Sequence, residues 1–362
     1  MARRNSVVRN SVVLSGLCAL APMILIAGAI DATEVRTTAF APERDTSLSV
    51  SSETHVNVDS HAGESSAAGE NTLGGQVSQS VDRGVWIWTT DVVTSTGSRQ
   101  NFLTFAQLKR LNGVYLYAYN LLPAYSGELK DFIDSANAIG MQVELLAGDP
   151  SWALTSAHWI GLDFVRQVVT FTASITGGNI PSGVHLDVEP YLLPGWTSDP
   201  SGIAAQYLDL LVQARQELAN SGMGLTLTVD IPFWFDTVTV THNNAMKTLN
   251  RHVQDVVDRI TIMDYRDFAH GDDGIVHHAL NEIGYAEVIS KGVTIGVETN
   301  DVEPEKVTFF EEGETVMESE LALVAQQYQT SPAFNGFAIH DFLGYVALAP
   351  IKLNYLPLVL SK

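Results

Sequence analysis

The most constraining feature of this sequence is a strand-then-helix pattern that occurs eight times after residue 84. Each unit begins with a short run rich in β-branched and aromatic residues and continues into a stretch whose apolar residues recur with a helical period. Eight such units in succession predict a (β/α)8 barrel, in which parallel strands close into a ring surrounded by helices. The predicted strands are 84–88, 113–120, 141–148, 183–190, 225–232, 259–266, 292–299 and 336–342.

An open, doubly wound parallel sheet is the alternative architecture for the same pattern. Such a sheet normally carries a glycine-rich phosphate turn after its first strand. The corresponding segment here, WIWTTDVV, contains no glycine. The barrel is therefore the predicted fold of a single domain over residues 81–362, which is a usual length for this architecture.

The first thirty residues have the character of an export signal. Arg3, Arg4 and Arg9 precede a long apolar run, as in secretory signal peptides, and the small residues at 27–29 offer a cleavage site. The apolar run is also long enough to remain as a membrane anchor. We therefore predict that residues 1–30 direct export, either to secretion or to a membrane-tethered place in the cell envelope.

Residues 31–80 are rich in Ser, Thr, Gly and Glu and lack apolar periodicity, which predicts a disordered linker. The only cysteine, Cys18, precedes this linker, so the predicted barrel has no disulfide. The formal net charge of −21 argues against nucleic acid as a partner, because an acidic surface repels phosphate backbones. We expect a monomer that needs no cofactor.

The predicted strands place polar side chains inside the barrel. Side chains alternate across a strand, so GVHLDVEP separates its valines and leucine from His185, Asp187 and Glu189. Helices cover the outside of a barrel, so the apolar set must pack beneath them and the polar set must face inward. Enzymes with this fold carry their active sites at the C-terminal ends of the strands.

Glu189 and Glu298 are the last inward-facing residues of the fourth and seventh predicted strands. Glycoside hydrolysis uses two carboxyl groups, one to protonate the leaving oxygen and one to attack or stabilise the cation-like centre. Asp187 precedes Glu189 on the same face, and its charge would raise the pKa of Glu189. We therefore predict Glu189 as the proton donor, with Glu298 as nucleophile or second carboxylate. Glu144 lies mid-strand and is expected to join a structural network with His185.

Aromatic residues gather at the predicted strand ends. Sugar rings present apolar faces above polar edges, so aromatic side chains at a barrel mouth are typical of carbohydrate sites. Asp230 ends the fifth predicted strand and suits substrate contact or support equally well. The predicted substrate contacts from this pattern are Trp88, Tyr119, Trp152, Trp196, Trp234 and Asp230.

SGVHLDVE resembles the fourth-strand signature of family-18 chitinases and their relatives, Asp-Gly-x-Asp-x-Asp-x-Glu. Gly183, Asp187 and Glu189 match the signature, whereas Ser182 and His185 replace its two earlier acids. The resemblance implies a TIM-barrel glycosidase in which Glu189 is the acid and Asp187 its partner.

Two further segments carry the same resemblance. MDY resembles the sixth-strand Met-x-Tyr of the family, with Arg266 where an Asp is usual, and GFAIHDF resembles its eighth strand, with His340 in place of Trp. The resemblance implies that Tyr265 binds the N-acetyl group of the substrate and that His340 lines the same site. Because that family uses the acetamide of the substrate as nucleophile, it would not need Glu298.

The placement of the two glutamates also resembles the large clan of retaining glycosidases with catalytic Glu on strands four and seven. Their strand-four motif is Asn-Glu-Pro, and this chain has Val188-Glu189-Pro190. In those enzymes the Asn, here replaced by Val188, holds the 2-hydroxyl of the sugar.

The leading hypothesis is a secreted glycoside hydrolase acting on a polysaccharide or cell-envelope glycan. The alternative is a non-catalytic carbohydrate-binding barrel of the cell envelope. A metal-dependent hydrolase built from His185, Asp187, Glu189 and His340 is a third hypothesis, although no His-x-His or His-Glu-x-x-His spacing occurs.

Overall fold

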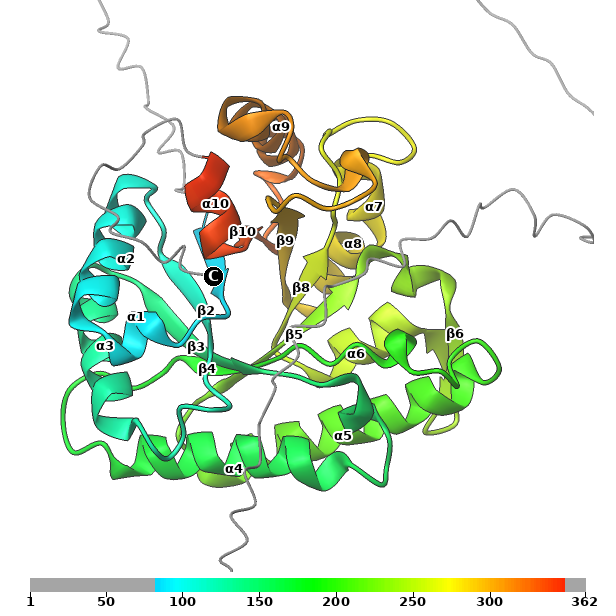
Figure 1. Cartoon of the computed structure of the whole chain (residues 1–362). Helices are drawn as coiled ribbons and strands as arrows, with labels where there is room; N and C mark the ends of the chain where they lie inside the picture. The colour runs from blue at the N-terminus through cyan, green and yellow to red at the C-terminus, as the bar shows by residue number, and fades with distance from the viewer. Residues whose placement is uncertain (1–81, 349–362) are drawn as a thin grey trace, which may run out of the picture. The chain divides into compact units, whose positions relative to one another are not determined.

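The computed structural model describes residues 82–348. The predicted export segment (1–30) and linker (31–80) lie outside the described residues, as do residues 349–362 of the predicted barrel domain. Eight parallel strands form a closed barrel in the order β1-β10-β9-β8-β5-β4-β3-β2, with helices around them (Figure 1). The predicted (β/α)8 fold is thereby confirmed. The barrel strands are β1(Asp82–Ile87), β2(Gly113–Tyr117), β3(Gln142–Ala147), β4(Gly183–Leu186), β5(Thr226–Pro232), β8(Arg259–Met263), β9(Gly292–Glu298) and β10(Phe334–His340).

All eight predicted strands are present, but several end earlier than predicted. β4 stops at Leu186, and Pro190 opens the 3-10 helix η2(Pro190–Leu192). Proline has no N–H to add to a ladder, and Glu189 before it already leaves the extended conformation at φ −105° and ψ 78°. Asp187 and Glu189 therefore lie just past the ladder, in the first turn of the loop at the barrel mouth.

Helices connect the strands and cover the outside of the barrel (Figure 1). The longest, α5(Pro200–Ser221), begins at Asp199, whose side chain accepts a hydrogen bond from the N–H of Gly202 at 2.9 Å, and it ends at Gly222 in the left-handed conformation. The other helices are α1(Asp91–Thr94), α2(Thr96–Leu108), α3(Ser126–Ala138), α4(His158–Ser174), α6(Leu249–Val256), α7(Ile275–His278), α8(Leu280–Ile289), α9(Gly313–Tyr328) and α10(Phe342–Leu348).

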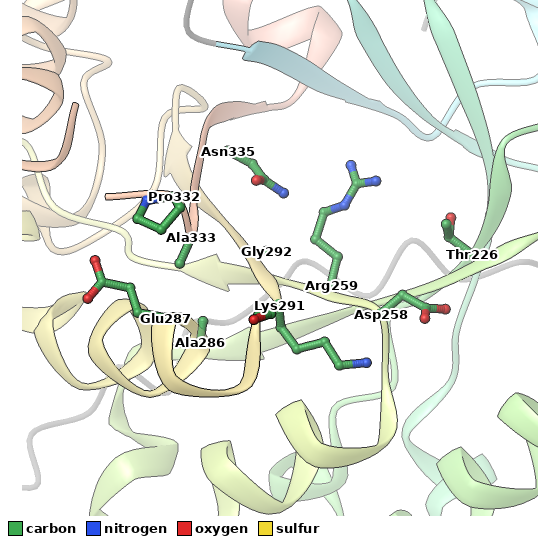
Figure 2. Close-up of a pocket in the computed structure, with 11 residues that line it drawn as sticks. Thr226, Asp258, Arg259, Ala286, Glu287, Lys291, Gly292, Pro332, Ala333 and Asn335 are labelled. Carbon is green, nitrogen blue, oxygen red and sulfur yellow. The ribbon is translucent and has the colours of Figure 1, made fainter. Parts of the chain in front are cut away.

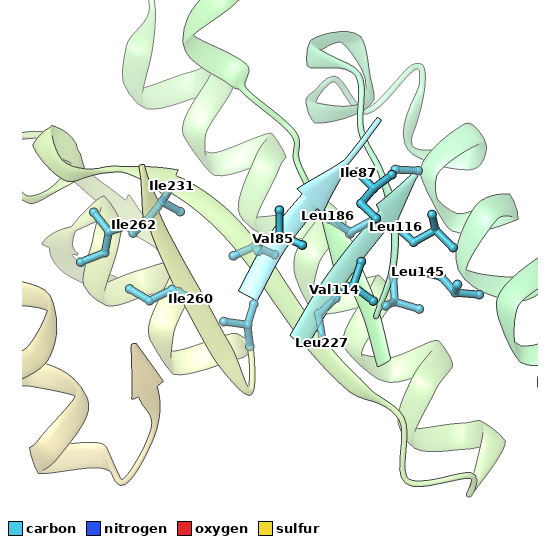
Figure 3. Packing of buried hydrophobic residues seen from close by; sticks show 14 of the residues in the cluster. Val85, Ile87, Val114, Leu116, Leu145, Leu186, Leu227, Ile231, Ile260 and Ile262 are labelled. Carbon is cyan, nitrogen blue, oxygen red and sulfur yellow. The ribbon is translucent and has the colours of Figure 1, made fainter. Parts of the chain in front are cut away.

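The apolar side of the strands packs beneath the helices in one large core, as the alternation predicts. Figure 3 shows members of this core on successive strands, including Val85, Leu116, Leu186 and Ile260. Burying each such side chain contributes about 1.5–3 kcal/mol to folding. The core thus fixes which face of every strand points outward, and the opposite face must supply the interior of the barrel.

A second, smaller cluster fills the inside of the barrel with Trp86, Tyr115, Leu146 and Ala338. The indole of Trp86 reaches across to β9, where a Cβ on Gly296 would come within 2.8 Å of its ring. A larger residue at position 296 would collide with this ring, so the glycine permits the interior packing.

A two-stranded hairpin, β6(Thr239–His242) and β7(Ala245–Thr248), extends the loop after β5 and was not predicted. Its turn residues Asn243 and Asn244 have positive φ values of 48° and 62°, which asparagine tolerates better than most residues. Among the helices between residues 82 and 348, none has the length and apolar character needed to cross a bilayer.

Candidate active site

The mouth of the barrel holds Asp187 and Glu189 on the same side of the segment that follows β4. Glu189 is 9% exposed, and its Oε2 accepts a hydrogen bond from the hydroxyl of Tyr191. Burial raises the pKa of Glu189 and the charge of Asp230 adds to this effect, whereas the Tyr191 hydrogen bond lowers it. The net effect is a raised pKa, so this carboxyl group keeps its proton to a higher pH than an ordinary glutamate.

Asp187 has fewer hydrogen-bond partners than Glu189 among the described residues. Its Oδ1 is buried and has no hydrogen-bond partner in the described part of the chain. Burial raises the pKa of Asp187 well above its usual range, and the neighbouring charges of Glu189 and Asp230 raise it further. Both carboxyl groups therefore keep a proton to a higher pH than ordinary acids.

Glu298, at the end of β9, has the opposite environment. Its Oε1 accepts from the N–H groups of Thr299 and Asn300 and from the Asn300 side chain at 2.7, 2.8 and 2.8 Å. Its Oε2 accepts from Nδ1 of His340 at 2.7 Å. Burial raises the pKa of Glu298, but the His340 charge and these hydrogen bonds outweigh burial and lower it. Glu298 is therefore a carboxylate fixed by hydrogen bonds to both of its oxygens.

His340, at the end of β10, links Glu298 to the aromatic wall of the site. The indole N–H of Trp88 donates to its Nε2 at 3.0 Å, and the ring of Tyr265 lies 5.8 Å away between centroids. Burial lowers the pKa of His340, but the charge of Glu298 outweighs burial and raises it to about 9. Because an indole N–H only donates, the Trp88 bond requires a lone pair on Nε2 and favours the neutral tautomer with its proton on Nδ1. With a pKa of about 9, His340 is charged at neutral pH, so the Trp88 contact is a hydrogen bond only in the neutral form of His340.

Tyr265, two residues after β8, lies between the carboxyl groups of the mouth. Its hydroxyl has no hydrogen-bond partner among residues 82–348, which leaves it available to a ligand. Burial raises the pKa of this hydroxyl well above its ordinary value, and nearby acids add to the effect: Glu298, Asp230, Asp187 and Glu189. Arg266, which stands where the chitinase-like pattern has an Asp, donates to the backbone carbonyl of Tyr265 at 2.7 Å and so supports its position.

Below the mouth, a buried network crosses the barrel interior through His185. Its Nδ1 bonds Glu144 at 3.0 Å and its Nε2 bonds Asp230 at 2.8 Å. Both partners are acceptors, so both ring nitrogens carry protons. Burial lowers the pKa of His185, but the two carboxylates raise it to about 10. The predicted association of Glu144 with His185 is confirmed.

Asp230 belongs to this network rather than to the open part of the mouth. Its Oδ1 is bound to His185, and its Oδ2 accepts from the indole N–H of Trp86 at 3.1 Å. Asp230 is 2% exposed. Both carboxylate oxygens of Asp230 therefore accept hydrogen bonds from the barrel interior, and its contact with a substrate stays a prediction.

The predicted aromatic contacts divide into two groups. Trp196 and Trp234 lie 6.4 Å apart between centroids and belong to one cluster with Tyr191, whose ring is 5.1 Å from Trp234. This cluster adjoins Glu189 through the Tyr191 hydroxyl.

Tyr119 and Trp152 form the other group, with ring centroids 5.5 Å apart, and both pack against Phe164 of α4. Trp152 is 4% exposed and belongs to the main core, so its ring is covered by protein. Trp152 lies in the 3-10 helix η1(Pro150–Ala153), and its predicted contact with a substrate stays a prediction.

Sequence reasoning missed the hydroxyl of Tyr191 as the partner of Glu189 and the donors of Thr299 and Asn300 around Glu298. The first depends on the turn at Pro190, and the second on a loop whose backbone N–H groups point back at the strand end. The only available signal was that these residues directly follow the two glutamates. Within residues 82–348, no group of three or more His, Cys, Asp or Glu side chains is arranged to hold a metal ion.

No protein-family model matches this sequence, and neither does any curated protein. The fold is similar to solved glycoside hydrolases. A glycoside hydrolase family 18 chitinase from Pseudoalteromonas aurantia has 13% identity and a TM-score of 0.47, with 72% of this chain and 94% of that chain covered. A family 39 enzyme from Xanthomonas axonopodis pv. citri has 11% identity and a TM-score of 0.49, with 73% and 59% covered.

Catalytic domain 2 of the Group II chitinase of Ostrinia furnacalis, solved with a bound chito-oligosaccharide, has 12% identity and a TM-score of 0.38, with 60% of this chain and 64% of that chain covered. The present chain thus spans less than two thirds of the length of the Xanthomonas and Ostrinia chains. At these identities the likeness is one of fold.

Proposed function

We propose that this protein is an exported glycoside hydrolase that cleaves a polysaccharide or cell-envelope glycan by carboxylate acid–base catalysis. The observation that carries the proposal is the pair of Asp187 and Glu189 at the barrel mouth. Both carboxyl groups are desolvated and both have raised pKa values. Neither has a cationic hydrogen-bond partner among the described residues. Such a pair retains a proton that a departing glycosidic oxygen can accept.

Glu189 is assigned as the proton donor. Tyr191 holds its Oε2, which orients the carboxyl group and leaves Oε1 free to face the substrate. Asp187 lies one step deeper, with a buried Oδ1. Its role is to hold a proton beside Glu189, whose charge raises the pKa of Asp187.

Glu298 is assigned to positioning rather than to nucleophilic attack. A carboxylate that accepts four hydrogen bonds and is 2% exposed is held in place by protein donors and is poorly accessible to a substrate. The attacking group is then the acetamide of the substrate itself, as the resemblance to family-18 chitinases implies, and the unpartnered hydroxyl of Tyr265 would hold it. This assignment favours glycans that contain N-acetylhexosamine.

The test is hydrolysis of an oligosaccharide panel by the unsubstituted protein and by Glu189→Gln. N-acetylated chito-oligosaccharides should be cleaved and their deacetylated counterparts should not. Glu189→Gln should lower kcat by about 10²–10⁴-fold, the range that general acid catalysis contributes. The matched control is Glu128→Gln on the exposed face of α3, which should retain full activity.

Equal activity of Glu189→Gln and the unsubstituted protein would show that Glu189 is not the proton donor. Glycan binding without turnover by both proteins would favour the non-catalytic binding barrel. Loss of activity on adding a chelator would favour the hypothesis of a metal-dependent hydrolase.

A further inference from the structure

Two adjoining cavities of about 380 and 360 Å³ lie at the N-terminal end of the barrel, opposite the carboxyl groups of the mouth. Both are lined by Thr226, Arg259 and Asn335, at or beside the starts of β5, β8 and β10. Figure 2 shows the first of them, with the guanidinium of Arg259 on the same side as the amide of Asn335. Their volumes are in the range of small-molecule sites, and the proposed hydrolysis uses neither cavity.

Arg259 is the principal charged group that both cavities share. Its side chain is 33% exposed, and its one ion pair within residues 82–348 joins Nη2 to Oε1 of Glu144 at 3.9 Å. That separation is too long for a hydrogen bond. A guanidinium has five N–H donors, and here all of them lack a protein acceptor in the described part of the chain.

Glu144 attracts the guanidinium of Arg259 but accepts no hydrogen bond from it. Oε1 of Glu144 accepts from Thr228 at 3.0 Å, and Oε2 is bound to His185 at 3.0 Å. Both oxygens of this carboxylate thus already accept a hydrogen bond from a side chain inside the barrel. The attraction holds the Arg259 side chain in the cavity while its donors remain available to a ligand.

The surroundings of Arg259 supply a second cation, neutral polar groups and four acids, of which Asp82 and Glu144 line the second cavity. Lys291, half-buried before β9, lines the first cavity and forms no ion pair with any residue between 82 and 348. Asp258 also lines it, but its charge is already paired with Arg215 at 3.1 Å. Glu287, exposed on α8, is the other acid of this cavity. The neutral polar groups are Thr226, Ser290 and Asn335 in the first cavity and Asn112, Gln142, Ser182 and Thr294 in the second.

We propose that these cavities bind a small sugar that carries an oxyanion, either a carboxylate or a phosphate. The planar guanidinium of Arg259 matches two oxygens of such a group, and Lys291 adds a second positive charge. The amide and hydroxyl side chains around them suit the hydroxyl groups of the sugar body. The site is independent of the proposed hydrolysis, because it lies at the opposite end of the strands.

The test is calorimetric titration of the full-length protein with glucuronate, glucose 6-phosphate and neutral glucose. At least one anionic sugar should bind saturably with one ligand per chain, and glucose should not bind at this site. Arg259→Gln should weaken anion binding by about tenfold or more, because it removes charge-assisted hydrogen bonds. Arg166→Gln removes the same charge from an exposed ion pair on α4 and should leave binding unchanged.

Absence of saturable binding by both anionic sugars, or equal affinity of Arg259→Gln and the unsubstituted protein, would overturn the proposal. The two anions also distinguish a sugar acid from a sugar phosphate as the preferred ligand. If Arg259→Gln does not fold, crystals of the unsubstituted protein soaked in the better ligand decide the matter. Density in contact with Arg259 supports the site, and an empty cavity contradicts it.

Discussion

Two glutamates occupy equivalent places at the mouth of this barrel, yet their surroundings give them opposite properties. Glu189 follows β4 and lies near another acid, Asp187, and its one hydrogen-bond donor within residues 82–348 is the Tyr191 hydroxyl. Glu298 ends β9 and receives hydrogen bonds from backbone, amide and imidazole groups. Burial raises the pKa of Glu189, whereas the donors around Glu298 lower its pKa despite burial.

Burial alone therefore does not decide whether the pKa of a carboxyl group in this barrel is raised or lowered. Both residues are almost completely buried, so desolvation favours the protonated form in both. The donors supplied by the following loop determine the outcome. A carboxyl group with few donors suits proton transfer, and one that accepts several hydrogen bonds suits the positioning of His340.

The largest effect is expected on stability from Glu298→Gln. The substitution removes the charge opposite His340 and turns an amide NH₂ group toward donors that need an acceptor. Removing one partner of the buried Glu298–His340 pair should lower the free energy of unfolding by about 3–5 kcal/mol. Urea denaturation measures this change. Glu128→Gln, on the exposed face of α3, should change it by less than about 0.5 kcal/mol. A loss as small as that of the control would mean that the donors around Glu298 do not stabilise the fold.

The next effect is a difference in pH dependence between Glu189→Gln and Glu298→Gln. The raised pKa of Glu189 means that its contribution to stability is fully present below its ordinary value of 4.5 and is lost as pH rises through the folded pKa. Glu189→Gln should therefore gain stability relative to the unsubstituted protein at neutral pH, and this gain should vanish in acid.

Glu298 should behave in the opposite way. Its lowered pKa contributes stability above 4.5 that is lost as pH falls through the folded pKa. The deficit of Glu298→Gln should therefore be largest at neutral pH and shrink in acid. Thermal unfolding of the three proteins between pH 3 and 8 measures both trends, and parallel curves for the two variants would refute the electrostatic contrast.

A smaller effect is expected from Tyr191→Phe. The tyrosine hydroxyl stabilises the charged form of Glu189, so its removal should raise the pKa of that carboxyl group further. The alkaline limb of kcat/KM should move to higher pH, while the maximal rate changes by less than about tenfold, because one hydrogen bond contributes about 0.5–1.5 kcal/mol. Tyr328→Phe removes a hydroxyl that donates to Val276 on the outer helices and should leave the profile in place. An alkaline limb that stays or moves to lower pH would show that Tyr191 does not tune Glu189.

The smallest effect is expected from the aromatic residues beside Glu189. Trp234→Ala should raise KM for oligosaccharides by about two- to tenfold with little change in kcat, since one aromatic contact contributes about 0.5–1.5 kcal/mol. Trp152→Phe should instead lower the melting temperature and leave KM unchanged, because Trp152 packs in the core. An increase in KM for Trp152→Phe alone would place the sugar on the other side of the mouth.

Much of the fold followed from residue periodicity alone. The alternation in GVHLDVEP separates Val184 and Leu186 from His185, and the structure places the former in the outer core and the latter inside the barrel. Trp86 and Tyr115, which alternate with outward-facing core residues, likewise lie inside the barrel. Alternation is a local property of the extended chain, and the closed sheet converts it directly into inside and outside.

The details of the candidate site depended on contacts that no periodicity contains. The burial of Trp152, the bond from Tyr191 to Glu189 and the hairpin at Asn243 all arise in loops, where side-chain direction follows turn geometry. The hydrogen bonds that occupy Asp230 come from β1 and β4, which lie far from it in sequence.

The sequence by itself determined that this chain forms a barrel with a column of polar residues inside it, and that Glu189 stands at the mouth. Strand alternation and the proline after Glu189 are sufficient for both conclusions. Only the tertiary structure decided which acid keeps a proton and which does not. The pKa of a buried carboxyl group depends on the donors and charges that other segments bring within a few ångströms. Among the described residues, Glu298 accepts from Thr299, Asn300 and His340, whereas Glu189 accepts from Tyr191.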